Sequence, residues 1–220
     1  KLSAYLKSSW LAPEELRKVA TPEGLKAVLL PFFIFDATAE SQYSGDIGIN
    51  WTEHYTKQET DSNGNTRTVH KTRTHTEWFP LSGTHLFEYR QHLVCGSEGV
   101  SESSTNEIEP FDIGKASPFD PRLLAGVIAE RFRVDKDAAE QTCHSEIKTL
   151  EGQEINRYLP GDKSRNVRYS TQINIKGVRT VLLPVYIASY RYSGDLLQLL
   201  VNGQSGNVGG PIPKSKKKMK

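Results

Sequence analysis

The sequence predicts an α+β fold with an antiparallel, β-rich body, on the strength of two observations. The first is an internal duplication: residues 28–34 (VLLPFFI) precede 43–46 (YSGD), and residues 181–187 (VLLPVYI) precede 192–195 (YSGD). The second is a mean hydropathy of −0.53, ordinary for antiparallel sheets with one solvated face. Each copy is expected to form a strand–turn–strand unit, because a tight turn fixes the register of the apolar strand.

The first half of the chain is expected to be mostly strand. Residues 25–37 are continuously apolar and predict a buried strand, in which Pro31 indicates an edge position or a bulge. Residues 47–80 alternate around the turn 61–65 (DSNGN) and predict a long hairpin. Neither face of its return strand is apolar near the tip, so the hairpin is expected to project. A turn at 81–83 then leads into a third strand.

Two central helices are expected over about 120–159. The first begins at Arg122, directly after Asp120 and Pro121, and the second is capped by Asp135. Side chains at helical spacing are expected to form the buried faces: Leu123, Leu124, Val127, Ile128 and Phe132 in the first helix, and Ala139, Cys143, Ile147 and Leu150 in the second.

The domain organisation follows from where the two copies lie. Halves at about 25–95 and 165–208 each carry one copy, the second half containing a turn at Gly177. We therefore expect a single α+β domain over 1–210 with approximate internal symmetry, opening on two short helices before residue 20. Residues 211–220 are predicted to be a basic, flexible tail.

The net charge of +2 is unevenly distributed. Without the tail lysines, 23 basic residues face 26 acidic ones, so the body carries about −3 and is no general binder of polyanions. Any such binding is assigned to the tail, where each lysine near an anionic membrane contributes about 1 kcal/mol. The tail lysines are Lys214, Lys216, Lys217, Lys218 and Lys220.

The two cysteines, Cys95 and Cys143, are too few for a disulfide framework. We favour two free thiols in a reducing, intracellular compartment. The alternative is one disulfide bridge between the two cysteines. No apolar stretch reaches the length of a membrane-spanning helix, so the chain is expected to be a soluble domain, one that can still lie at a membrane surface.

The sequence offers no firm catalytic or metal site. Cys-x-x-Cys, His-Glu-x-x-His, Gly-x-Ser-x-Gly and phosphate-binding glycine motifs are missing from it. His54 and His75 could face each other across the hairpin if its register centres between Gly64 and Asn65, but exposed sheet histidines are the preferred interpretation. We therefore expect no catalytic residues, no metal, no cofactor and no enzymatic activity.

One candidate binding surface remains in the body. Arg67, Lys71, Arg73 and His75 line one face of the hairpin, with Tyr55 and Trp78 expected nearby for stacking on bases. The alternative is a solvated ribbon whose charges prevent edge-to-edge aggregation.

Several segments resemble a family of mostly bacterial, uncharacterised proteins described as TFIIB-type zinc-ribbon-containing. The resemblance rests on residues 6–13, 31–37, 118–120, 190–194 and 201–206, and it spans nearly the whole chain. It implies a cysteine-rich zinc ribbon ahead of this region and, in some members, a hydrophobic C-terminal helix. Neither occurs in this sequence, so the resemblance transfers no metal ligand and no catalytic residue.

These observations predict a non-enzymatic scaffold or adaptor subunit of a larger assembly. Other protein subunits are its expected partners, and the C-terminal lysines are its expected contact with an anionic membrane. The alternative is a nucleic-acid-binding accessory protein that uses the hairpin face and the tail.

Overall fold

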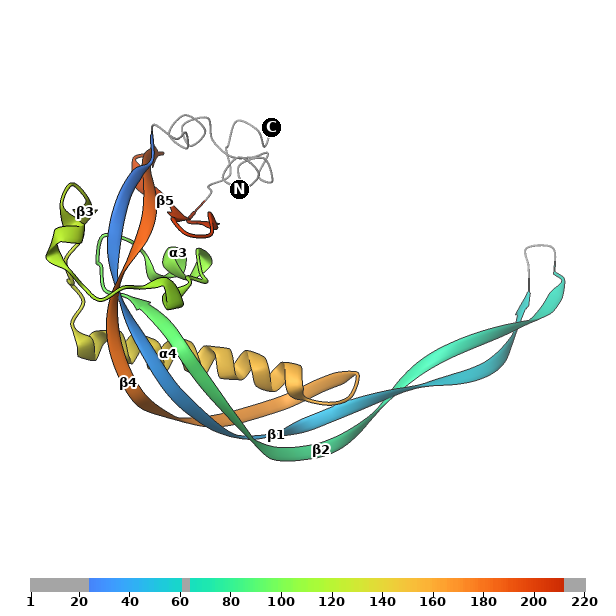
Figure 1. The fold of residues 1–220 in the computed structure, drawn as a ribbon. Helices are drawn as coiled ribbons and strands as arrows, with labels where there is room; N and C mark the ends of the chain where they lie inside the picture. The colour runs from blue at the N-terminus through green and yellow to red at the C-terminus, as the bar shows by residue number, and fades with distance from the viewer. Residues whose placement is uncertain (1–23, 61–63, 212–220) are drawn as a thin grey trace. The chain divides into compact units, whose positions relative to one another are not determined.

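The computed structural model describes residues 24–60 and 64–211. The expected N-terminal helices and the lysine tail therefore lie outside the described residues. Six strands form one sheet in the order β2-β1-β4-β5-β6, with β3 paired to β1 (Figure 1). The strands are β1 (Lys26–Thr60), β2 (Thr66–Cys95), β3 (Ile128–Ala129), β4 (Lys163–Tyr192), β5 (Asp195–Asn202) and β6 (Val208–Gly209).

The α+β prediction was wrong, because the fold is largely antiparallel sheet. The described residues contain two α-helices, α3 (Glu102–Glu107) and the longer α4 (Lys136–Tyr158). The helix expected from Arg122 is replaced by a short 3₁₀ helix, Pro121–Leu124, and by β3. Gly126 has a positive φ of 78°, and Ile128 and Ala129 pair in parallel with β1, so the helical spacing is not realised.

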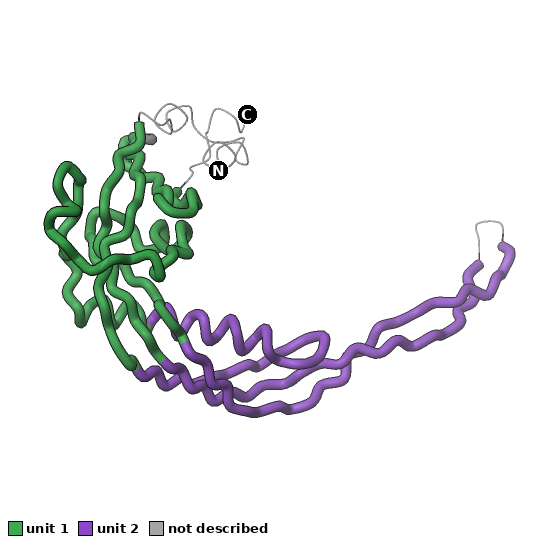
Figure 2. Tube along the Cα trace, viewed as in Figure 1, with its two compact units in different colours: residues 1–37, 89–144, 175–220 green, residues 38–88, 145–174 purple. Residues whose placement is uncertain are grey.

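The chain folds as two compact units (Figure 2). Unit 1 contains Lys1–Ala37, Tyr89–His144 and Ile175–Lys220, and unit 2 contains Thr38–Glu88 and Ser145–Asn174. The long strands contribute residues to both units. The single domain expected over 1–210 stays a prediction.

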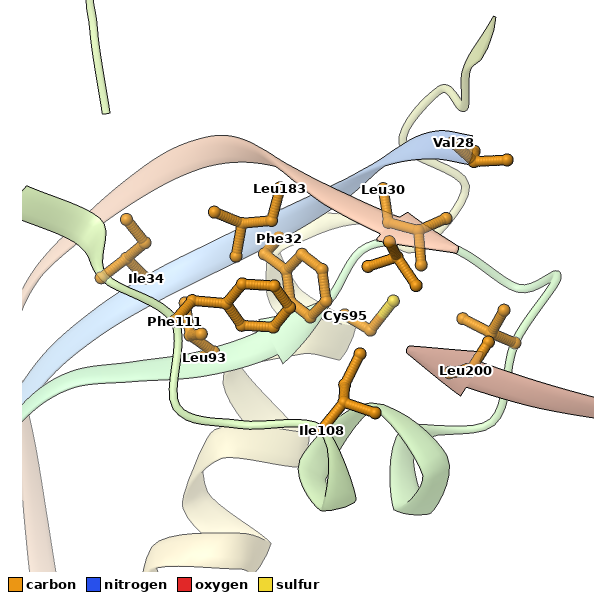
Figure 3. Close-up of a cluster of buried hydrophobic side chains, with 12 residues drawn as sticks. Val28, Leu30, Phe32, Ile34, Leu93, Cys95, Ile108, Phe111, Leu183 and Leu200 are labelled. Carbon is orange, nitrogen blue, oxygen red and sulfur yellow. The ribbon is translucent and has the colours of Figure 1, made fainter. Parts of the chain in front are cut away.

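Unit 1 is built on a strand that is covered on both faces. Residues 28–35 of β1 are buried almost without interruption, as expected for a continuous apolar run. One face packs into the core shown in Figure 3, where Phe32 lies 5.8 Å from the Phe111 ring. Side chains from β1, β2, β4, β5 and the segments on either side of α3 form this core: Val28, Leu30, Phe32, Ile34, Leu93, Cys95, Val100, Ile108, Phe111, Leu183, Val185 and Leu200.

The other face of β1 is covered by the chain that precedes α4. Phe132 packs edge-on against Phe33 with a centroid distance of 4.9 Å. Gly96 leaves room for this ring, since a Cβ there would stand only 2.6 Å from it. Phe132 nevertheless keeps 40% of its surface exposed, and Ile128 is 60% exposed, so the burial expected for these two side chains was wrong.

The duplicated segments lie on neighbouring strands, β1 and β4, and make equivalent contacts. The carbonyl oxygen of Pro31 accepts a hydrogen bond from the Gly96 amide at 2.8 Å, and that of Pro184 accepts one from the Gly203 amide at 2.8 Å. β2 thus flanks the first copy as β5 flanks the second. The two strands run antiparallel, because contacts at rising β1 numbers meet falling β4 numbers: Asp36 with Arg179, Ser41 with Thr171 and Asp46 with Arg165.

The repeated Tyr-Ser-Gly-Asp phrase adopts two different structures. In the second copy Ser193 and Gly194 have φ values of 53° and 96° and form the turn between β4 and β5. In the first copy the phrase stays inside β1, and a Cβ on Gly45 would stand 3.2 Å from the Val167 Cα on β4. The turn expected at 43–46 was therefore wrong, because continued pairing with β4 keeps the chain extended.

Two further expected turns are strand. β2 runs without interruption through 81–83, and β4 runs through Gly177. At Gly83 a Cβ would stand 2.6 Å from the Tyr43 hydroxyl, so this glycine makes room for an aromatic ring and does not turn the chain.

The second expected helix is confirmed as α4. Asp135 accepts a hydrogen bond from the Ala138 amide at 2.7 Å, as a capping side chain does, and Gly161 with φ 94° follows the helix end. Leu150, expected on the buried face, is exposed instead. The fully buried positions of α4 recur every four residues: Ala139, Cys143, Ile147, Glu151 and Ile155.

Candidate functional site

The predicted projecting hairpin becomes a two-stranded ribbon in unit 2. β4 begins at Lys163, beside the point where the Asp162 carboxylate accepts a hydrogen bond from the Asn50 amide at 2.7 Å. Beyond that point β1 has only β2 beside it within the described residues, and Figure 1 shows the two strands continuing as a pair. We call residues 51–60 and 66–76 the ribbon.

Cross-strand contacts between aromatic and charged side chains hold the ribbon together. Trp51 stacks on His75 with a centroid distance of 4.6 Å, and Arg73 lies over the Tyr55 ring at 5.3 Å. His75 Nε2 lies 2.7 Å from a carboxylate oxygen of Glu53. Trp51 keeps 49% of its surface exposed, so the part of the ring that His75 does not cover is available to a partner.

The three predicted binding residues of the ribbon have different surroundings. Lys71 forms an ion pair with Glu59, which raises the pKa of Lys71 and lowers that of Glu59. Arg73 is engaged with Tyr55, and Arg67 is exposed. Two of the three cations thus have partners inside the ribbon, which reduces the positive charge offered to a phosphate backbone. Lys214, Lys216, Lys217, Lys218 and Lys220 lie outside the described residues.

The stacking partners were predicted in part. Tyr55 accompanies Arg73, as the alternation of the strand suggested. Trp78 does not join this group, because the Arg165 guanidinium of β4 lies 4.1 Å above its ring. Sequence reasoning missed Trp51, although its alternation with Tyr55 could have indicated it.

The two hairpin histidines do not face each other. His75 lies against Trp51 and Glu53 of the opposite strand, and His54 is exposed. Among the residues that the structure describes, no group of three His, Cys, Asp or Glu side chains is placed to hold a metal ion.

A buried polar cluster, which the sequence did not reveal, fixes α4 to the sheet of unit 2. Glu151 is fully buried and accepts a hydrogen bond from the Ser41 hydroxyl at 2.6 Å. His85 Nδ1 lies 3.1 Å from the same carboxylate, and Thr171 Oγ1 lies 2.9 Å from Ser41. A buried carboxylate requires such partners, since burial without them is costly. We call these four residues the polar cluster.

The polar cluster does not have the order of a nucleophilic triad. In a triad the histidine lies between the hydroxyl and the acid and takes the hydroxyl proton. Here the carboxylate of Glu151 lies between Ser41 and His85, and the serine proton points to the acid. The arrangement joins α4 to β1, β2 and β4 and serves to position the helix.

Cys95 is likewise a structural residue. Both cysteines are buried, and burial raises the pKa of Cys95 to about 12. A thiol with this pKa carries almost no thiolate at neutral pH, and thiolate is the reactive form.

Comparison with known proteins gives one curated relative. The chain is 26% identical over 217 residues to the uncharacterised protein YdjG of Bacillus subtilis strain 168. The match covers 98% of this chain and 60% of the relative. Neither a family model nor a solved structure matches the chain. The zinc-ribbon resemblance therefore stays a prediction.

The helices in the described part of the chain were also compared with the needs of a bilayer. None of them is both long and apolar enough to cross a membrane.

Proposed function

We propose that this protein is a non-enzymatic scaffold or adaptor subunit, with the ribbon as its contact with other protein subunits. One observation carries the proposal: a two-stranded ribbon presents Trp51 with half its surface exposed, without a covering helix or third strand among the described residues. An isolated pair of strands is marginally stable in water, so coverage by a partner would stabilise it.

The chemistry of the ribbon suits a protein partner. Partly exposed aromatic side chains already held by stacking lose little rotamer freedom on binding, and aromatic residues are enriched at interface centres. Trp51 and Tyr55 are of this kind, each contacted by a side chain of the opposite strand. The balanced charges around them favour a mixed polar and apolar surface over a polyanion.

The proposal includes a location at an anionic membrane surface. Lys214, Lys216, Lys217, Lys218 and Lys220 would supply the attraction, which falls with rising salt.

Site-specific photocrosslinking tests the adaptor proposal. A photoreactive phenylalanine analogue replaces Trp51 in the full chain, expressed in cells of the source organism. We expect a discrete adduct of higher mass, identified by mass spectrometry. A matched chain with the analogue at Leu86, which is also exposed and lies outside the ribbon, should give none. Equal, diffuse labelling from both positions together with a monodisperse monomer would contradict the proposal.

A nucleic-acid-binding role is the second candidate, supported by the exposed Arg67 on the same ribbon as the stacked Trp51 and His75. It predicts binding to single-stranded oligonucleotides that weakens steeply as salt rises. Arg67→Ala should then reduce the salt dependence by about one counterion. The absence of binding at low salt would exclude this role.

A further inference from the structure

The ribbon leaves one edge of β1 open beyond the start of β4. The Gly48 carbonyl accepts a hydrogen bond from the Asp162 amide at 2.9 Å, and the Asn50 amide donates one to the Asp162 carboxylate at 2.7 Å. Among the described residues, no strand other than β2 lies beside residues 51–60 (Figure 1). The edge that β4 occupies in the body of unit 2 therefore continues along the ribbon without a neighbouring strand.

Alternate residues direct their backbone groups to this open edge. In an antiparallel strand the amide and the carbonyl of one residue point to the same side, and the side changes with each residue. Gly48 and Asn50 point to the side of β4. The even-numbered residues of the ribbon strand continue this row: Thr52, His54, Thr56 and Gln58. Such a row of backbone groups is a template for pairing with another strand.

The opposite edge of the ribbon, formed by β2, is unsuited to pairing with its own copy. Residues 66–76 contain the cations Arg67, Lys71 and Arg73 and no acidic residue. Two copies of this edge would place like charges against each other, which destabilises the pairing of strands. The β1 edge is therefore the better candidate for a contact between copies.

The charges of the β1 edge are complementary to those of a second copy of the same edge. An antiparallel copy centred on Tyr55 places Glu53 of each chain opposite Lys57 of the other. These pairs fall at non-hydrogen-bonded positions, where opposite Cα atoms are about 4.5 Å apart and the side chains come closest. Lys57 is exposed, and the Glu53 side chain is 44% exposed. Both charges are thus accessible to a second copy.

Other registers lack this match. A slide of two residues moves Glu53 opposite Tyr55 or opposite Glu59, which either removes the ion pairs or opposes like charges. A register that pairs Lys57 with Glu59 spans only residues 56–60 of the described strand, and Glu59 already has an ion pair across the ribbon. The charge pattern therefore selects the register centred on Tyr55.

We propose that the open edge of β1 pairs with the same edge of a second copy of this chain, antiparallel and centred on Tyr55. The four strands then follow the order β2-β1-β1-β2, and the contact is closed because both copies use the same edge. Pairing covers residues 51–59 and ends where Asp162 holds the Asn50 amide. Charges on an edge commonly prevent association between chains, but the spacing of these charges matches a copy.

The inference rests on the proposed function, in which the ribbon contacts protein subunits, and it identifies one such subunit as a second copy. Trp51 and Tyr55 lie on the same face of the strand as Glu53 and Lys57, because the spacing between them is even. Pairing would join this face to the equivalent face of the copy, with the two Tyr55 side chains adjacent. A sheet of four strands is also more stable than an isolated pair.

Charge reversal in the full chain tests the register. Sedimentation velocity over a dilution series should show a reversible dimer of the unsubstituted chain. Glu53→Lys alone and Lys57→Glu alone each oppose like charges at both pairs, so each should raise the dimer dissociation constant roughly tenfold or more. An equimolar mixture of these two variants restores opposite charges at both pairs and should dimerise again.

A matched control separates the register from general charge effects. Glu40→Lys makes the same charge change at an exposed position of β1 outside the ribbon, and it should leave the dimer unchanged. Circular dichroism verifies that each variant is folded.

Disulfide crosslinking locates the twofold axis. Tyr55→Cys places two thiols directly opposite each other, at a Cα separation of about 4.5 Å that a disulfide can span, so air oxidation should link the two copies. Thr52→Cys places its two thiols about 20 Å apart in this register, and it should not crosslink. Cys95 and Cys143 are buried and should not contribute.

Each outcome decides for or against the inference. A monomer at every concentration, larger open-ended assemblies, or a dimer that both charge variants leave intact would overturn it, as would equal crosslinking from residues 52 and 55. If the free chain is a monomer and the photoreactive analogue at Trp51 captures a different protein, the inference fails while the adaptor proposal stands. Dimerisation in this register without capture of another protein would support the inference and contradict the adaptor role.

Discussion

The strand β1 passes through three environments. Comparing them shows how the pattern of apolar and polar residues along the strand determines what covers it. In unit 1, residues 28–35 are apolar throughout and are covered on both faces. In unit 2, buried Ala39, Ser41 and Tyr43 alternate with exposed residues, and α4 lies on one side. In the ribbon no residue of β1 is buried.

The difference between these regions is a difference in local stability. Free energies of local opening follow buried apolar contacts, so we expect opening to be hardest at residues 28–35, easier beside α4 and easiest in the ribbon. Substitutions in the three regions should therefore have unequal effects on stability. The measurements below test whether the three regions follow the expected order.

The largest effect is expected in the unit 1 core. Phe32→Ala removes a fully buried ring that contacts Phe111, and it should lower the free energy of unfolding by about 3–5 kcal/mol. Phe79→Ala, which removes a ring on β2 that is 42% exposed, should cost less than about 1 kcal/mol. Urea denaturation measures both. Equal losses would show that the core of unit 1 does not dominate stability.

The next effect is expected in the polar cluster. Glu151→Ala leaves the Ser41 hydroxyl and His85 without their acceptor, and it should cost about 2–3 kcal/mol. Glu154→Ala, one turn along and partly exposed, removes only a surface ion pair with Arg157 and should change stability by less than about 0.5 kcal/mol. Denaturation monitored by helix circular dichroism provides the comparison. A neutral Glu151→Ala would contradict the role assigned to the cluster.

A smaller effect is expected in the ribbon. Trp51→Ala removes the stacking on His75, worth about 1 kcal/mol, and should speed amide exchange in the ribbon roughly fivefold. Global unfolding should not change. His54→Ala, which removes an exposed ring without such stacking, serves as the control. Uniformly faster exchange in both units would mean that the ribbon does not open independently.

The smallest effect is expected for Cys95, whose contribution to the pH dependence of stability appears only at alkaline pH. Burial raises the pKa of Cys95 from 9.0 to about 12, so the folded state holds its proton where the unfolded state releases it. The resulting stabilisation is complete below pH 9 and is lost between about pH 9 and 12. Cys95→Ala should therefore flatten the alkaline fall in stability. Rapid alkylation of Cys95 in the native protein at pH 8 would contradict its burial.

Sequence reasoning succeeded where one local pattern determined the structure. The apolar run at 25–37, the hairpin around 61–65 and the helix capped by Asp135 were all identified correctly. Each depends on neighbouring residues alone: periodicity, turn chemistry or a capping side chain.

It failed where distant pairing decided the outcome. Leu123 and Val127 have helical spacing, yet β3 pairs with β1 just beyond the end of β2, and the helix does not form. No helix was predicted at α3, where the local signal is Ser101, which accepts a hydrogen bond from the Ser104 amide.

Of the candidate site, the sequence predicted the ribbon but not the polar cluster. The ribbon and its cations could be identified from alternation, but their partners depend on a register that the sequence left open. The polar cluster could not be predicted, because Ser41, His85, Glu151 and Thr171 come from four elements and are brought together only by the sheet and α4.

The matching hydrogen bonds at Pro31 and Pro184, on the neighbouring strands β1 and β4, are the contacts that an approximate twofold axis between these strands would give. Two identical chains related by such an axis would form a dimer whose interface is this strand pair. In the present chain one copy ends in a tight turn and the other is drawn out into the ribbon. Duplication followed by unequal elongation would thus convert a self-complementary interface into an internal join and leave one copy extended as the ribbon.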